Sequence, residues 1–327
     1  MSVTLIATGG TIASTRGDDG MVTTTLAAAE LLSLAGVDDL EVELVDLSVP
    51  GSWNLTTELV AAVAGEVRAA LGRGSRGVVV THGTDVLEET AWACELLVGD
   101  AADRGAVVLT CAMRHASEFG GDGPRNLTDA LTVAADPVAA GRGALVCANG
   151  ELHHARWVTK THATALSTFA SPGRGPVGEV GERGVRIVAP SPPRPPAVGT
   201  RLEAAVPVVV SHWDADPDLL DWHLSRGARG VVLQGGGAGN VNGNLVEGVA
   251  RAIAAGVPVV GTTRCQMGEV TPIYGGLGGF ASLHAMGVIP SHGLSAGKAR
   301  LALGAALAVD PAPDGVRAWF DRLALAP

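Results

Sequence analysis

Three consecutive β-branched residues, Val78–Val80, run directly into the polar turn His82-Gly83-Thr84-Asp85. An apolar run without polar alternation is typical of a strand buried on both faces of a parallel sheet. Asp85 and Glu88 fit a capping box, so we expect a helix to begin at or near Asp85. Thr84 and Asp85 should then lie at the carboxyl end of a parallel strand, where open α/β sheets bind their ligands. The alternative is an ordinary glycine-containing turn with Thr and Asp as caps.

The same strand, turn and helix pattern recurs through the first half of the chain. Further strands are expected at Ser2–Ala7, Glu41–Leu47, Ala106–Thr110 and Ala144–Cys147, with helices at Leu26–Ala35, Thr57–Leu71 and Asn126–Ala135. Strands that alternate with helices at this spacing indicate βαβ units. The sequence therefore predicts an α/β fold with a larger N-terminal domain built on a doubly wound, mostly parallel sheet.

A proline-rich segment, Pro190–Pro196, separates this part from a second and smaller α/β unit. Neither a helix nor a central strand tolerates such a segment. After it, strands are expected at Val208–Ser211, Gly230–Leu233 and Val257–Thr262, and helices at Leu219–Arg226, Leu245–Ala255 and Gly297–Leu307. We therefore expect an N-terminal domain over residues 1–188, a linker over 189–205 and a C-terminal domain over 206–327.

Two adjacent glycines follow the first expected strand, in Thr8-Gly9-Gly10-Thr11. Glycines there let the backbone turn tightly and approach a ligand closely. Thr11, like Thr84, should therefore emerge at the carboxyl end of a strand. The polar, glycine-containing stretch Ser14–Thr25 that comes next suits a mobile surface loop able to act as a lid.

A single lysine, Lys160, lies in a stretch over residues 151–161 that we interpret as a hairpin or edge strand. A threonine hydroxyl becomes a nucleophile once a base takes its proton, and a lysine can be that base. An aspartate beside the lysine can orient it. Backbone N–H groups around Gly10 and Gly83 can stabilise an oxyanion. Together these groups form a possible hydrolytic set, although most lysines of this kind are solvated surface charges.

Composition excludes several classes of function. The 327 residues carry a net charge of −10 and no run of Lys or Arg, which disfavours nucleic-acid and anionic-membrane binding. The amino-terminal segment lacks a cationic region and a long apolar run, and no segment approaches the length of a membrane span. We therefore expect a cytoplasmic location.

No cofactor or metal is expected. The loop Gly235–Asn240 lacks the glycine spacing of a dinucleotide fingerprint, and Gly293–Lys298 is one residue short of a phosphate loop. His153, His154 and His162 cluster without zinc-binding spacing. Four cysteines lie far apart without a CxxC pair, so we interpret them as reduced core thiols; they are Cys94, Cys111, Cys147 and Cys265.

Two long segments of the chain are TGGTIAS at Thr8–Ser14 and THGTDVLEETA at Thr81–Ala91. Both closely resemble the signature segments of the bacterial-type L-asparaginases. Shorter matches follow in the family's order: AMR at Ala112–Arg114, DGPRNL at Asp122–Leu127, VTKT at Val158–Thr161 and GAGN at Gly237–Asn240. The match covers essentially the whole chain.

The resemblance implies a role for each matching residue. Thr11 would be the nucleophile that forms an acyl-enzyme, and Lys160 would act as a base through Thr84, next to Asp85. The remaining implied residues contact substrate: Ser52 would bind the α-carboxylate and Asp85 the α-amino group, with Gly10, Trp53, Gly83, Thr84 and Ala112 lining the pocket.

The family also implies an oligomer. Asn240 resembles a residue that reaches the site of a neighbouring subunit, so a homodimer or homotetramer is expected. Glu269 is a candidate for the acidic residue that enters with it.

Two positions depart from the family pattern. The family has a tyrosine in the lid, whereas Met21 aligns with that place and the only tyrosine is Tyr274. The family's Ser-x-Asp pattern occurs here as Ser52-Trp53-Asn54, which replaces a carboxylate with an amide.

The leading hypothesis is an amidohydrolase that converts L-asparagine to L-aspartate and ammonia. A dual asparaginase-glutaminase fits the same motifs. A non-catalytic sensor of an acidic amino acid would keep the pocket without needing Lys160. An amidotransferase component acting on charged tRNA is disfavoured by the acidic charge.

Overall fold

A computed structural model describes residues 2–37, 39–47, 51–196 and 198–324 of the chain. The chain divides into two compact units, Met1–Pro192 and Pro193–Pro327. Ala197, within the expected linker, lies outside the described residues.

The first unit is built on an eight-stranded sheet in the order β12-β11-β8-β7-β6-β5-β1-β4. Strands β4, β1, β5, β6 and β7 run parallel, and β8, β11 and β12 continue the sheet in antiparallel pairs. The strands are β1 (Val3–Ala7), β4 (Val42–Asp46), β5 (Gly77–Thr81), β6 (Ala106–Thr110), β7 (Ala144–Ala148), β8 (Glu151–His154), β11 (Gly178–Gly181) and β12 (Gly184–Ile187). The predicted α/β class with a mostly parallel sheet is confirmed.

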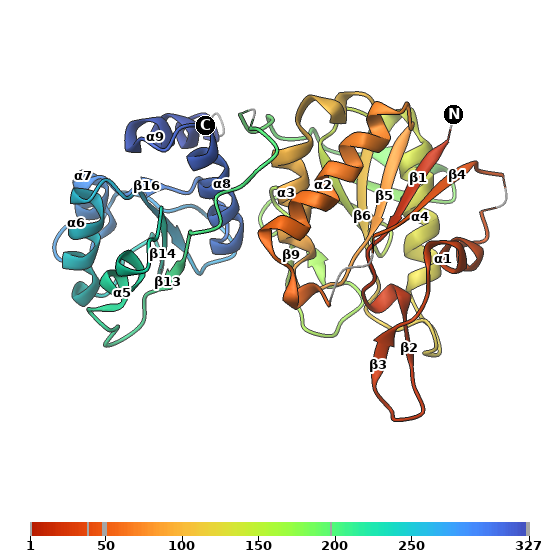
Figure 1. Ribbon diagram of the computed structural model, residues 1–327, viewed down its shortest axis with the longest axis horizontal. Coiled ribbons are helices and arrows are strands. Elements are labelled where there is room, and N and C mark those ends of the chain that lie inside the picture. Colours follow the sequence, from red (N-terminus) through yellow and green to blue (C-terminus); the bar gives the residue numbers. More distant parts are fainter. Residues whose placement is uncertain (1, 38, 48–50, 197, 325–327) are drawn as a thin grey trace. The chain divides into compact units, whose positions relative to one another are not determined.

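Helices cover both faces of this sheet (Figure 1). They are α1 (Ala28–Ala35), α2 (Thr57–Gly72), α3 (Leu87–Val98) and α4 (Gly123–Ala135). One buried cluster joins alternate strand residues such as Leu5 and Val79 to Leu31 of α1 and Leu131 of α4. The strand residues between them, such as Val78 and Val80, are also fully buried. Because side chains alternate along a strand, the opposite face must also be covered, and α2 and α3 pack there.

The strand order fixes where a ligand can bind. Among the five parallel strands, the first in the chain, β1, lies between the second, β4, and the third, β5. The chain therefore adds β4 on one side of β1 and then crosses to the other side, where it adds β5, β6 and β7. Such a reversal opens a crevice at the carboxyl ends of β1 and β5, the two strands between which the direction changes. Ala7 pairs with Thr81, so the loops that carry Thr11 and Thr84 leave the sheet at the same level.

The second unit contains a four-stranded parallel sheet in the order β13-β14-β15-β16. Its strands are β13 (Val208–Val210), β14 (Val231–Gly235), β15 (Val259–Thr263) and β16 (Ile289–Pro290), and its helices are α5 (Leu219–Ser225), α6 (Val246–Ala254), α7 (Phe280–Met286), α8 (Ala296–Val309) and α9 (Pro313–Asp321). A cluster that includes Leu220, Val249 and Phe280 packs α5, α6 and α7 on the sheet.

Three expectations differ from the structure. Helix α3 begins at Leu87 with Val86 as its cap and no side-chain capping bond, so the capping box between Asp85 and Glu88 is wrong. The stretch Ser14–Thr25 is a hairpin of β2 (Ser14–Arg16) and β3 (Val22–Thr24), not a loop. Cys265 is exposed, whereas the other three cysteines are buried as expected.

No helix within the described part of the chain has both the length and the apolar character needed to cross a bilayer.

Candidate active site

Thr11 opens a short 3-10 turn, Thr11–Ala13, directly after the glycine pair in the loop that follows β1. Gly9 and Gly10 have φ angles of 90° and 87°, a region that side chains other than glycine rarely adopt. A Cβ atom on Gly10 would lie only 2.4 Å from the amide nitrogen of Gly83. Glycine at position 10 is therefore required both for the turn and for close packing of the two loops.

The Gly83 loop is packed equally tightly on its other side. A Cβ atom on Gly83 would lie 2.6 Å from Oγ of Ser52, which belongs to the short turn Ser52–Asn54 after β4. Three loops, after β1, β4 and β5, thus converge at the crevice. Ser52 Oγ is buried and has no hydrogen-bond partner among the described residues. A buried hydroxyl without a partner is available to a ligand.

Thr84 and Asp85 contact Lys160 directly. The Lys160 ammonium donates to Oγ1 of Thr84 at 2.9 Å and to Oδ1 of Asp85 at 3.0 Å. Thr84 is buried, the Lys160 side chain is 16% exposed and the Asp85 side chain is 50% exposed. The cluster therefore has a sheltered side at Thr84 and a solvent-facing side at Asp85.

Lys160 lies on a separate two-stranded ribbon. Strand β9 (Thr159–Lys160) pairs antiparallel with β10 (Phe169–Ala170). The Lys160 main-chain N–H donates to Oε2 of Glu88 at 2.5 Å. Glu88, expected to cap its own helix, reaches outward to the ribbon instead.

The loop that carries Ala112 is held by the start of α4. The Asp122 carboxylate accepts hydrogen bonds from the main-chain N–H groups of Met113 and Arg114. Nδ2 of Asn126 donates to the carbonyl oxygen of Cys111 at 3.0 Å. These contacts fix the backbone on both sides of Ala112, which is fully buried.

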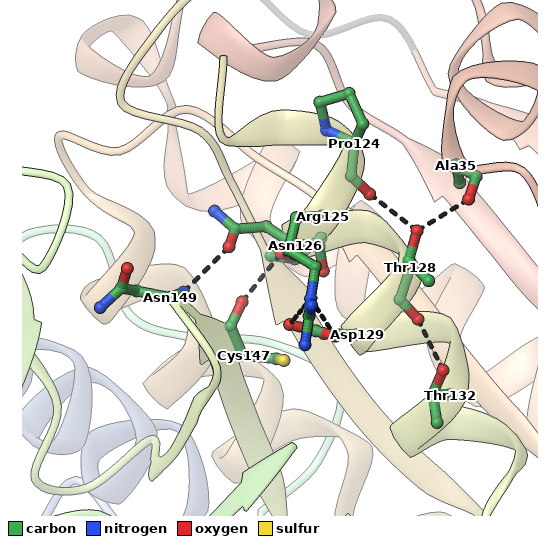
Figure 2. A network of polar contacts seen from close by, with 10 residues as sticks. Ala35, Pro124, Arg125, Asn126, Thr128, Asp129, Thr132, Cys147 and Asn149 are labelled. Atoms are coloured by element: carbon green, nitrogen blue, oxygen red, sulfur yellow. Dashed lines mark hydrogen bonds and ion pairs between the residues drawn. The ribbon is translucent and has the colours of Figure 1, made fainter. Parts of the chain in front are cut away.

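Asn126 also binds the turn between β7 and β8. Its Oδ1 accepts from the main-chain N–H of Asn149 at 2.9 Å (Figure 2). Asn149 has a φ of 52°, so the bond stabilises a strained turn. Further along α4, Thr128 donates to the carbonyl oxygen of Ala35 and so joins α4 to α1 (Figure 2).

The β2–β3 hairpin begins right after the Thr11 turn and stands out from the sheet (Figure 1). It is anchored to the loop after β6, since Ala116 donates its main-chain N–H to the Ser14 carbonyl oxygen and Arg16 donates its own to Ser117 Oγ. Met21 lies at the hairpin turn, and its side chain is 62% exposed. The hairpin strand nearest to the glycine pair carries Thr24, which would contact a Cβ atom on Gly9 at 3.3 Å.

Burial controls the protonation of two groups next to these loops. The pKa of His82 is lowered to about 4 because the ring is fully buried, and its Nδ1 donates to the Gly83 carbonyl oxygen at 2.7 Å. His82 is therefore neutral at pH 7. Burial raises the pKa of the Cys111 thiol, so this group beside Ala112 is not a thiolate nucleophile.

The other expected site residues lie as follows. Trp53 is 71% exposed on the turn that carries Ser52. Asn240 belongs to the second unit, where its Oδ1 accepts from the main-chain N–H of Phe280 at 3.0 Å. That bond holds the Asn240 loop to the start of α7.

Comparison with known proteins identifies the family. The profile described as "Asparaginase, N-terminal" matches residues 2–192, and that of the "Glutaminase/Asparaginase C-terminal domain" matches residues 205–320. This chain belongs to the asparaginase family. The resemblance inferred from the sequence motifs is thereby confirmed.

Several relatives of this asparaginase-family chain match over most of their length. A "Probable L-asparaginase" of Deinococcus radiodurans is 37% identical, over 97% of this chain and 96% of its own. L-asparaginase 2 of Bacillus subtilis is 30% identical, over 98% and 86%. An L-asparaginase of Bacillus licheniformis is 31% identical, over 94% and 95%.

Sequence reasoning missed the role of Glu88 in this asparaginase-family site. A glutamate in the first turn of a helix has two possible partners, its own cap or a neighbouring segment. Only the absence of a capping hydroxyl at Val86 could have favoured the second choice.

Proposed function

We propose that this protein hydrolyses the side-chain amide of L-asparagine to give L-aspartate and ammonia. The main observation in support is that the Lys160 ammonium contacts both Thr84 and Asp85. These residues lie at the crevice where the strand order of the sheet reverses. Thr11 emerges from the neighbouring strand, across the close approach of Gly10 and Gly83. Two adjacent loops thus supply a nucleophile and an orienting carboxylate, and the β9–β10 ribbon supplies the base.

The reaction proceeds in two steps. Oγ of Thr11 attacks the amide carbon, and its proton passes through Thr84 to Lys160, whose side chain takes part in this step as the uncharged amine and becomes the ammonium. The carbon–nitrogen bond then breaks, and the leaving nitrogen takes a proton and departs as ammonia. Water attacks the resulting ester at the same carbon, which releases aspartate and restores the Thr11 hydroxyl. Main-chain N–H groups around Gly10 and Gly83 stabilise the oxyanion in both steps.

Substrate recognition uses the groups around this cluster. The Ser52 hydroxyl, which has no hydrogen-bond partner within the described part of the chain, binds the α-carboxylate. The exposed Asp85 carboxylate binds the α-ammonium. The resemblance to the family assigns the lining of the pocket to the buried Ala112 together with Trp53, Gly83 and Thr84.

We also propose a homodimer or homotetramer in which Asn240 enters a neighbouring subunit's site. Beside Asn240, the segment Met267–Leu277 exposes four large apolar side chains, those of Met267, Ile273, Tyr274 and Leu277. This segment is continuous with the Asn240 loop, because Val241 donates its N–H to the Gly278 carbonyl oxygen. A second copy of the chain would remove the apolar side chains from water.

The test is a steady-state ammonia-release assay with asparagine and glutamine in parallel. Release from asparagine supports the proposal, and comparable kcat/KM values for both amides favour a dual asparaginase-glutaminase. Tight binding of aspartate without any ammonia release would replace the proposal with an amino-acid sensor.

A further inference from the structure

The ribbon that carries Lys160 receives little support from its own strands. Strand β9 is two residues long, and β10 is its strand partner in the described part of the chain. Two short paired strands are marginal by themselves. The position of the Lys160 ammonium therefore depends on what ties the ribbon to the rest of the unit.

Two side chains provide such ties. The Glu88 carboxylate accepts from the main-chain N–H of Lys160 at 2.5 Å. At the other strand, Ser171 follows β10, and its Oγ lies 3.0 Å from Nδ1 of His153 on β8. The Glu88 tie acts at Lys160 itself, whereas the His153 tie acts at the far strand.

Glu88, Thr84 and Asp85 all belong to one turn and the start of one helix. Lys160 therefore contacts this single segment at both ends, through its main-chain N–H at Glu88 and through its ammonium at Thr84 and Asp85. Glu88 lies in the first turn of α3, where the helix dipole favours a carboxylate. The helix dipole thus favours a negative charge at the position that accepts from the Lys160 N–H.

We infer that Glu88 is a positioning residue that sets the placement of Lys160 in the active site. This inference rests on the proposed function, since it assigns to Glu88 the task of holding the proposed base. Glu88 touches the Lys160 main chain and acts on the reaction through that residue. Without the Glu88 carboxylate as acceptor, the ribbon can shift. The Lys160 ammonium then moves out of hydrogen-bond distance of Thr84 Oγ1.

The experiment compares two nearly isosteric variants, Glu88→Gln and Glu88→Met. Both remove the charge, but only glutamine keeps an oxygen that can accept from the Lys160 N–H. Because a misplacement of about 1 Å can lower a rate by about 10²-fold, Glu88→Met should lower kcat by about 10- to 100-fold. KM should stay within about threefold, and Glu88→Gln should retain kcat within about threefold of the wild type.

The matched control is Glu58→Gln, which removes a first-turn glutamate from α2 and should leave kcat unchanged. A second control combines Glu88→Met with Lys160→Met. Since Glu88 acts through Lys160, the small residual rate of the double variant should lie within about twofold of the residual rate of Lys160→Met alone.

The outcomes separate this inference from the proposed function. If the wild type releases no ammonia from asparagine, both are overturned. If the wild type is active and Lys160→Met is not, then wild-type kcat in Glu88→Met, or equal losses in the Gln and Met variants, overturns only the role of Glu88. Should Glu88→Met fail to fold by circular dichroism, Glu88→Ala replaces it with the same expectations.

Discussion

Lys160 lies outside the eight-stranded sheet, yet its ammonium binds two side chains of the loop after β5. We expect Thr11→Ala and Lys160→Met each to abolish turnover of asparagine, while the far-ultraviolet circular dichroism spectrum stays unchanged. Thr11 is half-buried and Lys160 partly exposed, so neither change opens a large cavity. Because groups that act as a unit lose activity non-additively, the double variant should be scarcely worse than either single variant. Full activity of Thr11→Ala would disprove its assignment as nucleophile.

His82 makes stability depend on pH. Its pKa is about 4 in the folded protein, against 6.5 for an unperturbed ring, so between these values the unfolded chain binds more protons. Stability from this residue is therefore complete above pH 6.5 and is lost as the pH falls toward 4, by about 3 kcal/mol. Urea unfolding at pH 7 and pH 4.5 measures the difference.

The control for this pH effect is His82→Gln, which does not titrate and keeps a donor for the Gly83 carbonyl oxygen. This variant should weaken the dependence of the unfolding free energy on pH without removing it. Part of the dependence should remain because burial also lowers the pKa of His153. If the pH dependence of the unfolding free energy is unchanged in His82→Gln, then folding does not lower the pKa of His82, and the prediction is wrong.

The β2–β3 hairpin carries Met21, the residue that we expect to correspond to the tyrosine of the family's lid. A methionine thioether is a weak acceptor and cannot donate a proton. Since Met21 is largely exposed at the hairpin turn, we expect Met21→Tyr to change kcat by less than about tenfold. Met21→Ala should act chiefly on KM, through closure of the hairpin. Steady-state kinetics on asparagine test both variants. A gain of about 10²-fold in kcat for Met21→Tyr would show that the natural site is slow because it lacks the tyrosine.

Helix α4 supports the Ala112 loop through Asn126. Asn126→Ala removes the partners of the Cys111 carbonyl oxygen and the Asn149 N–H, and each unsatisfied group costs about 1–3 kcal/mol. We expect a total loss of about 2–6 kcal/mol of unfolding free energy, measured by urea unfolding. Thr132→Ala on the same helix removes only a hydroxyl bond to the Thr128 carbonyl oxygen at an exposed site and should change stability by less than about 0.5 kcal/mol. Equal losses in the two variants would contradict this role of Asn126.

Elements that are buried on both faces can be predicted from the sequence. Strand β6 has the bounds that the sequence predicts, because every residue of Ala106–Thr110 is buried and the run is continuous. The exposed hairpin strand Val22–Thr24 gives no such signal, since its residues are polar or exposed throughout. Strands β11 and β12 escape prediction too, because their glycines and short length resemble a turn. The positions of Thr11 and Thr84 follow from glycine turn chemistry, whereas the contact of Glu88 with Lys160 joins segments that only the tertiary fold brings together.

The exposed apolar segment Met267–Leu277, next to Asn240, predicts that the chain forms an oligomer. Light scattering should give the mass of a dimer or tetramer at micromolar concentration. Replacing both Ile273 and Leu277 with Asp should shift the mass toward the monomer and lower kcat/KM, because charges would face the apolar surface. A fully active monomer would refute the shared site, and the matched exposed change Val309→Asp should leave the mass unaltered.

Strand β1 is synthesised before β4 and β5, yet it lies between them in the sheet. During translation its apolar edge stays open until residues 77–81 have left the ribosome and paired with it. The same pairing brings the Gly10 loop against Gly83. A nascent or truncated chain that ends before β5 therefore has the threonine without its surroundings, and it exposes an edge prone to aggregation rather than half of a working site.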